Sequence, residues 1–151
     1  MTTSYARCAM PASARAPELL VDTSVAVALT VTDHEHHGST FRVLSGRKLG
    51  LAGHAAFETF SVLTRLPAPA RRTPAAVARL LAADFPGSRF LGARAAASLF
   101  TQLEAAGIAG GGVYDALVGA AAREHRLKLA TRDRRALEIY RVLDVDVELL
   151  P

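Results

Sequence analysis

The chain has 151 residues, of which 50% are hydrophobic and 21% charged, with a formal net charge of +4. This length suits one domain with its own core, and the hydrophobic content excludes a disordered chain. A single cysteine, Cys8, excludes an internal disulfide and fits a reducing compartment. No apolar run reaches the ~20 residues that cross a bilayer, and residues 1–18 lack the apolar segment of a secretory signal. We therefore expect a cytoplasmic protein with a loose N-terminal extension over residues 1–18.

Apolar runs alternate with amphipathic segments from residue 19 onward. Val25, Ala28 and Leu29 recur at helical spacing just after a short apolar run, which predicts a strand followed by a helix. The expected elements of this half are a strand at 19–22, a helix at 23–30, a helix capped by Asp33 that continues to Arg47, a strand at 49–53 and a helix at 55–66.

The second half continues the alternation. Pro74 stands where a helix begins, and Gly107 stands where one ends. The expected helices are 75–85, 93–106, 114–126 and 134–143, and the expected strands are 89–91, 127–130 and 145–150. Such alternation predicts an α/β protein built from βαβ units, with a parallel sheet covered by helices on both faces.

Four carboxylates occupy one kind of position in this pattern. Asp22 ends one predicted strand and Asp133 comes shortly after another, whereas Glu58 and Asp115 stand in the first turns of predicted helices. In a parallel sheet these positions line a single edge, where ligand crevices open. Four acids at one edge repel one another unless a cation lies among them, so the pattern predicts a divalent metal site.

Each acid also has a structural alternative. Asp22, Asp115 and Asp133 stand at helix starts, where aspartate is a favoured cap. Glu58 shares its helix face with Ala55, and we expect it to point toward packed surroundings with no cation three or four residues away. A shared function explains the four positions better than four separate structural roles do.

Hydroxyl side chains stand close to two of these acids. Thr131 lies two residues before Asp133, on the same side if the strand continues that far, so its hydroxyl could orient a carboxylate or a metal-bound water. Thr23 and Ser24 after Asp22 could act in the same way. Their ordinary roles as strand and helix-cap residues remain an equal alternative.

Other motifs carry less information. Residues 33–37 (DHEHH) lack the spacing that places two histidines one turn apart, and a solvated helix start is favoured there. The glycine-rich run at 107–112 is not followed by Lys and Ser or Thr, which excludes a Walker A loop. Cys8 has no base nearby in the sequence and is a poor candidate nucleophile.

The basic residues suggest a polyanionic partner. Setting the four acids aside leaves 18 basic against 10 acidic residues, a net charge of +8, and 16 of the basic residues are arginine. Arginine is suited to bidentate phosphate contacts. A genome of high GC content explains the arginine count as well, so this signal alone does not identify a substrate.

Four segments, residues 19–25, 57–66, 113–118 and 129–135, resemble the acidic motifs of the PIN-domain family, and within it the VapC-type toxins. The resemblance extends over residues 19–150 and implies a single PIN-like nuclease domain at 19–151 with a three-layer α/β/α sandwich. It also implies an endoribonuclease dependent on Mg²⁺, with Mn²⁺ as substitute, that acts as the toxin of a toxin–antitoxin pair. The implied partners are RNA, a VapB-type antitoxin that inhibits the enzyme, and a second copy in a homodimer.

The resemblance also assigns roles to individual residues. Asp22 and Asp115 are expected metal ligands, with Asp133 as a further ligand, and Glu58 is expected to orient or deprotonate the attacking water. Thr131 is expected to hold the water network. The arginines placed by sequence at the mouth of the site, where they would bind RNA phosphates, are Arg132, Arg134 and Arg135.

Two other functional classes remain open at this stage. One is a non-catalytic module that binds RNA or an antitoxin, against which the complete set of four acids argues. The other is a metal-dependent phosphatase, against which the serine at position 24, where that class has a second aspartate, argues.

Overall fold

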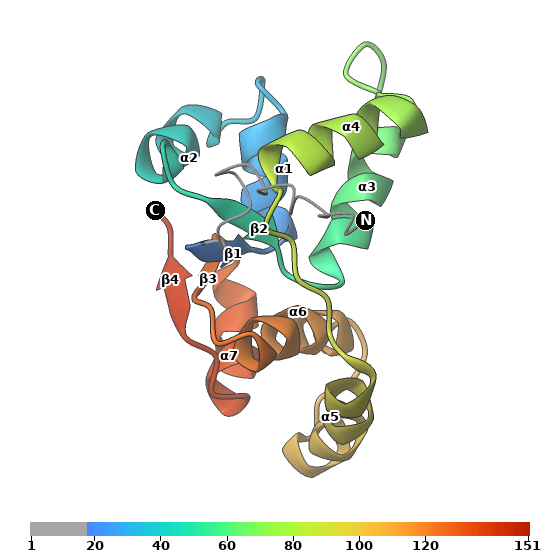
Figure 1. The fold of residues 1–151 in the computed structure, drawn as a ribbon, viewed down its shortest axis with the longest axis vertical. Coiled ribbons are helices and arrows are strands. Elements are labelled where there is room, and N and C mark those ends of the chain that lie inside the picture. Colours follow the sequence, from blue (N-terminus) through green and yellow to red (C-terminus); the bar gives the residue numbers. More distant parts are fainter. Residues whose placement is uncertain (1–17) are drawn as a thin grey trace, which may run out of the picture.

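The computed structural model describes residues 18–151, so the predicted N-terminal extension lies, apart from Glu18, outside the described residues. The described residues form a sheet of four parallel strands in the order β2-β1-β3-β4 (Figure 1). The strands are β1 (Leu19–Val21), β2 (Leu49–Leu51), β3 (Leu129–Thr131) and β4 (Val147–Leu149). Because all four run in one direction, their carboxyl ends meet at one edge of the sheet.

Helices cover both faces of this sheet, as the alternating pattern predicts. They are α1 (Thr23–Thr30), α2 (His37–Leu44), α3 (Ala55–Arg65), α4 (Pro74–Asp84), α5 (Ala93–Ala106), α6 (Gly112–Glu124) and α7 (Leu137–Val142), with a 3₁₀ turn, η2 (Arg134–Ala136), before α7. Figure 1 shows α1 to α4 on one side of the sheet and α6 and α7 on the other, with α5 packed outside α6. The predicted α/β/α sandwich is confirmed.

The central strand β1 divides the core between the two helical layers. Leu19 and Val21 are fully buried in one cluster with residues of α1 to α4. Leu20 points to the other face and packs in a second cluster that contains Val118 of α6 and Tyr140 of α7. The alternation of side chains along a strand thus anchors β1, and with it the residue that follows, from both sides.

Three predicted elements differ from the structure. The second helix begins at His37 rather than after Asp33, because hydrogen-bonded turns occupy the residues before it. Residues 89–91 form no strand: Arg89 makes only an isolated bridge to Ala52. The predicted helix at 134–143 is divided into η2 and α7.

No helix within residues 18–151 is long and apolar enough to cross a membrane.

Candidate active site

The sheet order places the candidate site at a change in chain direction across the sheet. The chain leaves β1 to form β2 on one side, and β3 then pairs with the opposite side of β1. Ligand crevices of parallel sheets open where the strand order reverses in this way, beyond the carboxyl ends of the strands. Asp22 directly follows β1, and Thr131 ends β3.

Asp22 is a buried carboxylate held by three hydrogen-bond donors. Its side chain accepts hydrogen bonds at Oδ1 from the Ser24 hydroxyl (2.6 Å) and the Val25 amide (3.1 Å), and at Oδ2 from the Thr131 hydroxyl. Burial raises the pKa of Asp22 above its usual value, the three hydrogen bonds oppose this, and the charge of Asp133 adds to it. Asp22 does cap α1, but it is only 5% exposed, which capping alone does not require.

The two loops that carry Asp22 and Asp133 are joined through hydroxyl groups. Thr131 is fully buried; its hydroxyl donates to Asp22 and accepts a hydrogen bond from the Asp133 amide (3.0 Å). The Ser24 hydroxyl accepts a hydrogen bond from the Arg132 amide (2.9 Å). Both hydroxyls therefore orient a carboxylate, one of the two roles considered for them from the sequence.

Asp115 does not cap its helix. α6 begins at Gly112, and its N-cap is Gly111, which makes no side-chain capping hydrogen bond. The pKa of Asp115 is raised to about 6, first by burial and then by the negative charges of Asp133, Glu58 and Asp22, while Arg135 opposes the shift. The structure thus brings the four acids into one electrostatic environment.

Glu58 lies in a different environment from the one predicted. Its side chain is 37% exposed, and the imidazole Nε2 of His54, one helical turn earlier, lies 3.6 Å from its Oε1. Its Oε2 accepts a hydrogen bond from the Thr23 hydroxyl (2.6 Å). The expectation of packed surroundings without a basic neighbour was wrong, because the face shared with Ala55 turns toward a cavity at the level of Glu58 and because His54 stands four residues before it.

The three predicted arginines have different surroundings. Arg135 is 92% exposed at its side chain and donates from its amide (2.9 Å) and Nε (3.2 Å) to Asp133, which caps η2. Arg132 donates from Nη1 to the Thr40 hydroxyl (3.2 Å). Arg134 is exposed and borders neither of the two cavities at the site.

Two hollows open beside the carboxylates, and they meet at Thr23 and Val62. The first, of about 660 Å³, is bordered by His54, Phe57, Glu58, Arg65 and Tyr114 among others. The second, of about 440 Å³, is bordered by His34, Glu35, His36, Arg132, Asp133 and Arg135 among others. Glu58 thus borders the first hollow and Asp133 the second, whereas Asp22 and Asp115 border neither.

His54 and Tyr114 were not identified from the sequence. Their rings stack with centroids 5.1 Å apart and an interplanar angle of 20°. The spacing of His54 to Glu58 was a usable signal, since residues four apart share a helix face. The sequence indicated Tyr114 only as the neighbour of Asp115, because its stacking partner, His54, stands at the start of a different helix, α3.

The acids fit a hard divalent cation by donor chemistry and charge. Carboxylate oxygens are the ligands that Mg²⁺ and Mn²⁺ prefer, and a cation would offset the mutual repulsion that raises the pKa of Asp115. Within residues 18–151, no three Asp, Glu, His or Cys side chains form a ready-made metal-binding group. The charge distribution therefore carries the argument for a cation.

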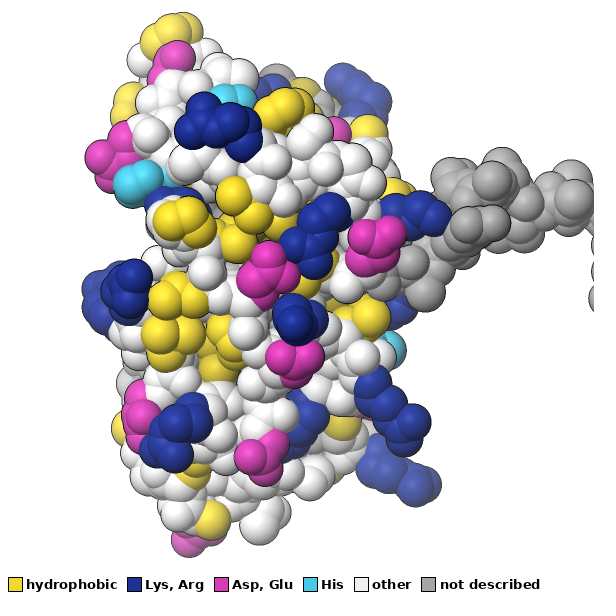
Figure 2. All heavy atoms as spheres, turned by 90° about the vertical axis from the view of Figure 1, so that its left-hand side faces the viewer, with side chains coloured by type: hydrophobic (Ala, Val, Ile, Leu, Met, Phe, Trp, Pro, Cys, Tyr) yellow, Lys and Arg dark blue, Asp and Glu magenta, His cyan; other side chains and the backbone are white. Residues whose placement is uncertain are grey.

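The exposed edge of the sheet carries charges of both signs. Figure 2 shows the face that includes β4, where basic and acidic side chains are interspersed. Arg47, for instance, pairs with Glu148 of β4 at 2.9 Å. The basic surplus is thus partly compensated on this face, so phosphate binding has to be argued from the residues that border the two hollows.

Comparisons with known proteins agree with this architecture. The sequence profile of the PIN domain matches residues 19–142. The chain is 47% identical over 131 residues to Ribonuclease VapC27 of Mycobacterium tuberculosis, covering 87% of this chain and 96% of the relative. It is also 47% identical over 131 residues to Ribonuclease VapC40 of the same species, covering 85% of this chain and 96% of the relative.

Two solved structures share the fold. VapBC2 from Rickettsia felis, bound to a promoter DNA fragment, has a TM-score of 0.64 at 14% identity, over 88% of this chain and 98% of that one. DNA-bound VapBC from Salmonella typhimurium has a TM-score of 0.63 at 19% identity, over 87% and 97%. PIN ribonucleases generally depend on a divalent metal, and the relatives support the predicted class of toxin ribonuclease. By the family profile and the identity to the two ribonucleases, this chain belongs to the PIN domain family.

Proposed function

We propose that this protein is the toxin of a type II toxin–antitoxin pair, an endoribonuclease that hydrolyses RNA phosphodiester bonds with Mg²⁺, for which Mn²⁺ substitutes. The observation that carries the proposal is that the charges of Asp133, Glu58 and the buried Asp22 all act on Asp115. The 47% identity to ribonucleases VapC27 and VapC40 supports the reaction class.

In this proposal Asp22, Asp115 and Asp133 hold the cation. The cation supplies charge neutralisation at the phosphate and an activated water when it is bound. Thr131 fixes Asp22 through its hydroxyl, so that the carboxylate is oriented before the substrate arrives.

Glu58 is the residue proposed to orient or deprotonate the attacking water. Its Oε2 is held by Thr23, while its Oε1 faces His54 at 3.6 Å. The side chain borders the larger hollow, so an attacking water held in that hollow would lie beside its carboxylate. Thr23 thereby acts as a positioning residue for Glu58.

Arginines beside the acids are proposed to bind backbone phosphates. Arg132 and Arg135 border the smaller hollow and fit this role better than Arg134, which borders neither hollow. Such contacts position an RNA without reading its sequence.

An antitoxin of VapB type is the proposed inhibitor. An apolar groove of about 320 Å³ is bordered by Leu29, Phe41, Leu44 and Phe85, and Phe41 is 55% exposed there. Such a groove suits the apolar face of an amphipathic helix. The same antitoxin would also block the enzyme if one of its arginines entered the site and paired with the carboxylates.

We further propose that the toxin forms a homodimer, which light scattering on the purified protein would test.

One assay separates this function from its two rivals. Purified protein is given a structured RNA or a chromogenic phosphate ester, each with Mg²⁺, with Mn²⁺ or with EDTA. A ribonuclease cleaves the RNA only when metal is present and leaves the ester intact. Ester hydrolysis would indicate a phosphatase, RNA binding without cleavage would indicate a non-catalytic module, and full cleavage in excess EDTA would contradict the proposed metal dependence.

Expression in bacteria tests the toxin role. The wild-type protein should arrest growth, and Asp115→Asn should relieve the arrest at an equal level of folded protein. Since Asp115 does not cap α6, a purely structural role predicts little change. Full toxicity of this variant would remove Asp115 from the proposed site.

A further inference from the structure

Exposed aromatic rings surround the larger hollow next to Glu58. Tyr114 is 51% exposed and Phe57 is 65% exposed, and both border this hollow. His54 stacks on Tyr114 and lies 6.3 Å from the Phe57 ring, between centroids. Single exposed apolar side chains need no explanation, but exposed rings that adjoin one another at a hollow are typical of a binding surface.

The wall formed by α3 combines three kinds of side chain. Phe57, Ser61 and Arg65 follow one another at intervals of four residues, so they lie on one face of the helix. Glu58 borders the same hollow. From Phe57 to Arg65 the helix rises by about 12 Å. Arg65 is exposed and makes no ion pair within residues 18–151. Along this wall of the hollow the helix therefore presents the ring of Phe57, the carboxylate of Glu58 and the unpaired guanidinium of Arg65.

We propose that this hollow is a nucleobase subsite: an unpaired base next to the scissile phosphate stacks on Tyr114 and Phe57, and Arg65 binds a neighbouring phosphate. The inference rests on the proposed ribonuclease function and specifies how the RNA is held. Proteins recognise single-stranded RNA by stacking its splayed bases on aromatic side chains and binding its backbone with arginine.

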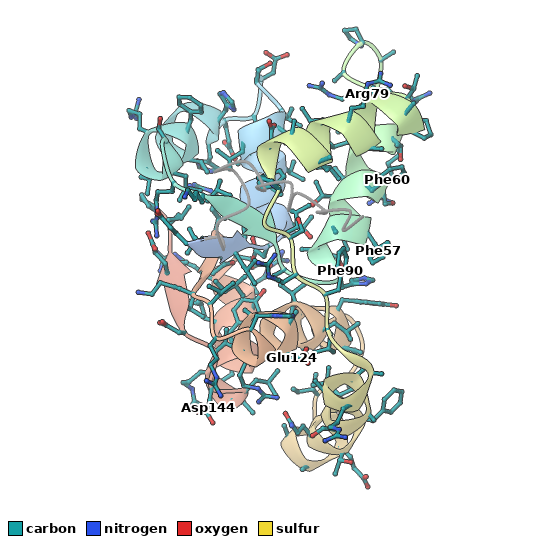
Figure 3. All side chains as sticks on the ribbon, in the orientation of Figure 1. Phe57, Phe60, Arg79, Phe90, Glu124 and Asp144 are labelled. Carbon is teal, nitrogen blue, oxygen red and sulfur yellow. The ribbon has the colours of Figure 1, made fainter. Side chains whose placement is uncertain are left out.

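The polar lining favours RNA over a protein partner. A base has polar edges that Thr23, Ser61 and His54 of this hollow can meet. On its other side Phe57 borders a separate apolar groove, of about 290 Å³, whose lining includes Phe60 and Phe90. Figure 3 shows Phe57 and Phe90 side by side, and their ring centroids are 5.9 Å apart. That groove suits an apolar partner, whereas the hollow beside Glu58 does not.

This division provides a matched pair of variants. Of these two cavities, Tyr114 borders the polar hollow and Phe90 borders the apolar groove, yet the two side chains are almost equally exposed, at 51% and 53%. Steady-state cleavage of short single-stranded RNAs is measured for Tyr114→Leu, Tyr114→Phe and Phe90→Leu. Loss of one stacked base should raise the KM of Tyr114→Leu about ten-fold with a smaller change in kcat. Tyr114→Phe keeps the ring and should restore the wild-type KM, and Phe90→Leu should not differ from the wild type.

Stacking itself is measured with the fluorescent base aminopurine, placed at successive positions of the RNA. The measurement uses Asp115→Asn protein, which should leave the RNA uncut. Aminopurine fluorescence should be quenched on binding when the base stands at one particular position of the RNA. Adding Tyr114→Leu to this protein should remove that quenching. Arg65→Ala should weaken binding to all RNAs alike and lower the salt dependence of binding by about one phosphate contact. Phe57→Leu provides a second loss of ring surface if Tyr114→Leu fails to fold.

Three results decide the matter. Wild-type KM and unchanged quenching in folded Tyr114→Leu would overturn the subsite. Equal losses in Tyr114→Leu and Phe90→Leu would also overturn it, since they would assign the whole aromatic surface to a protein partner or to stability. Absence of metal-dependent cleavage of any RNA by the wild type would instead overturn the proposed function, while the quenching measurement would still test base binding directly.

Discussion

The hydroxyl of Thr131, at the end of β3, donates a hydrogen bond to the carboxylate of Asp22, which follows the adjacent strand β1; the two residues are 109 positions apart. Both side chains are buried, so water does not replace this contact readily. The parallel pairing of β1 with β3 sets the position of both residues. Orientation of the central acid is therefore a direct consequence of the sheet.

Removal of this hydroxyl should affect stability and activity together. Thr131→Val keeps the shape but removes the donor to Oδ2 of Asp22 and the acceptor of the Asp133 amide, while Ser24 and Val25 still donate to Oδ1 of Asp22. We expect a loss of about 1–3 kcal/mol in the free energy of unfolding and at least about a ten-fold loss of kcat. Urea unfolding and steady-state cleavage measure the two effects. Thr131→Ser retains the hydroxyl and should stay close to the wild type; equal activity of Thr131→Val would exclude the orienting role.

The stability of the metal-free protein should depend on pH through Asp115. Its pKa is raised from 3.8 to about 6, so between these values the folded state binds more protons than the unfolded state. The contribution of Asp115 to stability is then fully present below pH ~4 and is lost as pH rises through the pKa of the folded state. Because Asp115 is only half buried, solvent screening limits the cost to the order of 1 kcal/mol.

The Asp115→Asn variant isolates this contribution. In EDTA, the difference in unfolding free energy between variant and wild type should grow in favour of the variant from pH ~4 to pH ~7. Urea titrations of both proteins at several pH values measure it. If the difference in unfolding free energy stayed constant with pH, the raised pKa would not belong to Asp115.

The sequence was sufficient to predict most of the fold. The apolar run that forms β1 and the helical spacing in α1 are local signals, and strands alternating with helices predict a parallel sheet. The predicted helix at 93–106 with its left-handed Gly107 cap is confirmed residue for residue. The four acids could be proposed from the sequence because their positions at element ends are also local properties.

Apart from His54, which stands four residues before Glu58, what differed from the prediction depends on contacts between distant segments. The surroundings of Glu58 are set by Thr23 on another helix and by the open hollow, which no pattern within α3 indicates. Residues 89–91 have strand-like composition but meet β2 at single residues, so only isolated bridges form. Arg134 is neighbour to two arginines that border the smaller hollow, yet it is exposed and borders neither hollow, and its role stays a prediction. Such outcomes follow from tertiary packing.

Close packing between α6 and α7 should make Gly119 intolerant of a larger residue. A Cβ at Gly119 would lie 2.9 Å from Cδ1 of Tyr140 and 3.0 Å from Cγ2 of Val145. Gly119→Ala should therefore lower the free energy of unfolding by about 1–2 kcal/mol, because overpacking outweighs the gain in helix propensity. Gly38→Ala in α2 is the matched control: its nearest neighbour would be Arg42 Nη1 at 3.9 Å, and it should stabilise by up to about 1 kcal/mol. A melting temperature of Gly119→Ala at or above that of Gly38→Ala would contradict the tight contact.

Metal binding should stabilise the protein through the same four acids that repel one another without it. Mg²⁺ or Mn²⁺ should raise the wild-type free energy of unfolding by about 2.7 kcal/mol at 100 times the dissociation constant. Asp115→Asn removes one charge, so the variant should melt at or above the wild type in EDTA and lose most of the metal-induced gain.

Melting curves of three proteins, in EDTA and in Mn²⁺, measure this metal effect. The third protein, Glu104→Gln, carries the same kind of change at an exposed position near the end of α5, outside the acids that act on Asp115. Glu104→Gln should keep the full metal-induced rise in melting temperature, since the carboxylate of Glu104 does not belong to the proposed site. If the acids served only as helix caps, metal would leave all three curves unchanged, and a full shift in Asp115→Asn would show that the cation binds elsewhere.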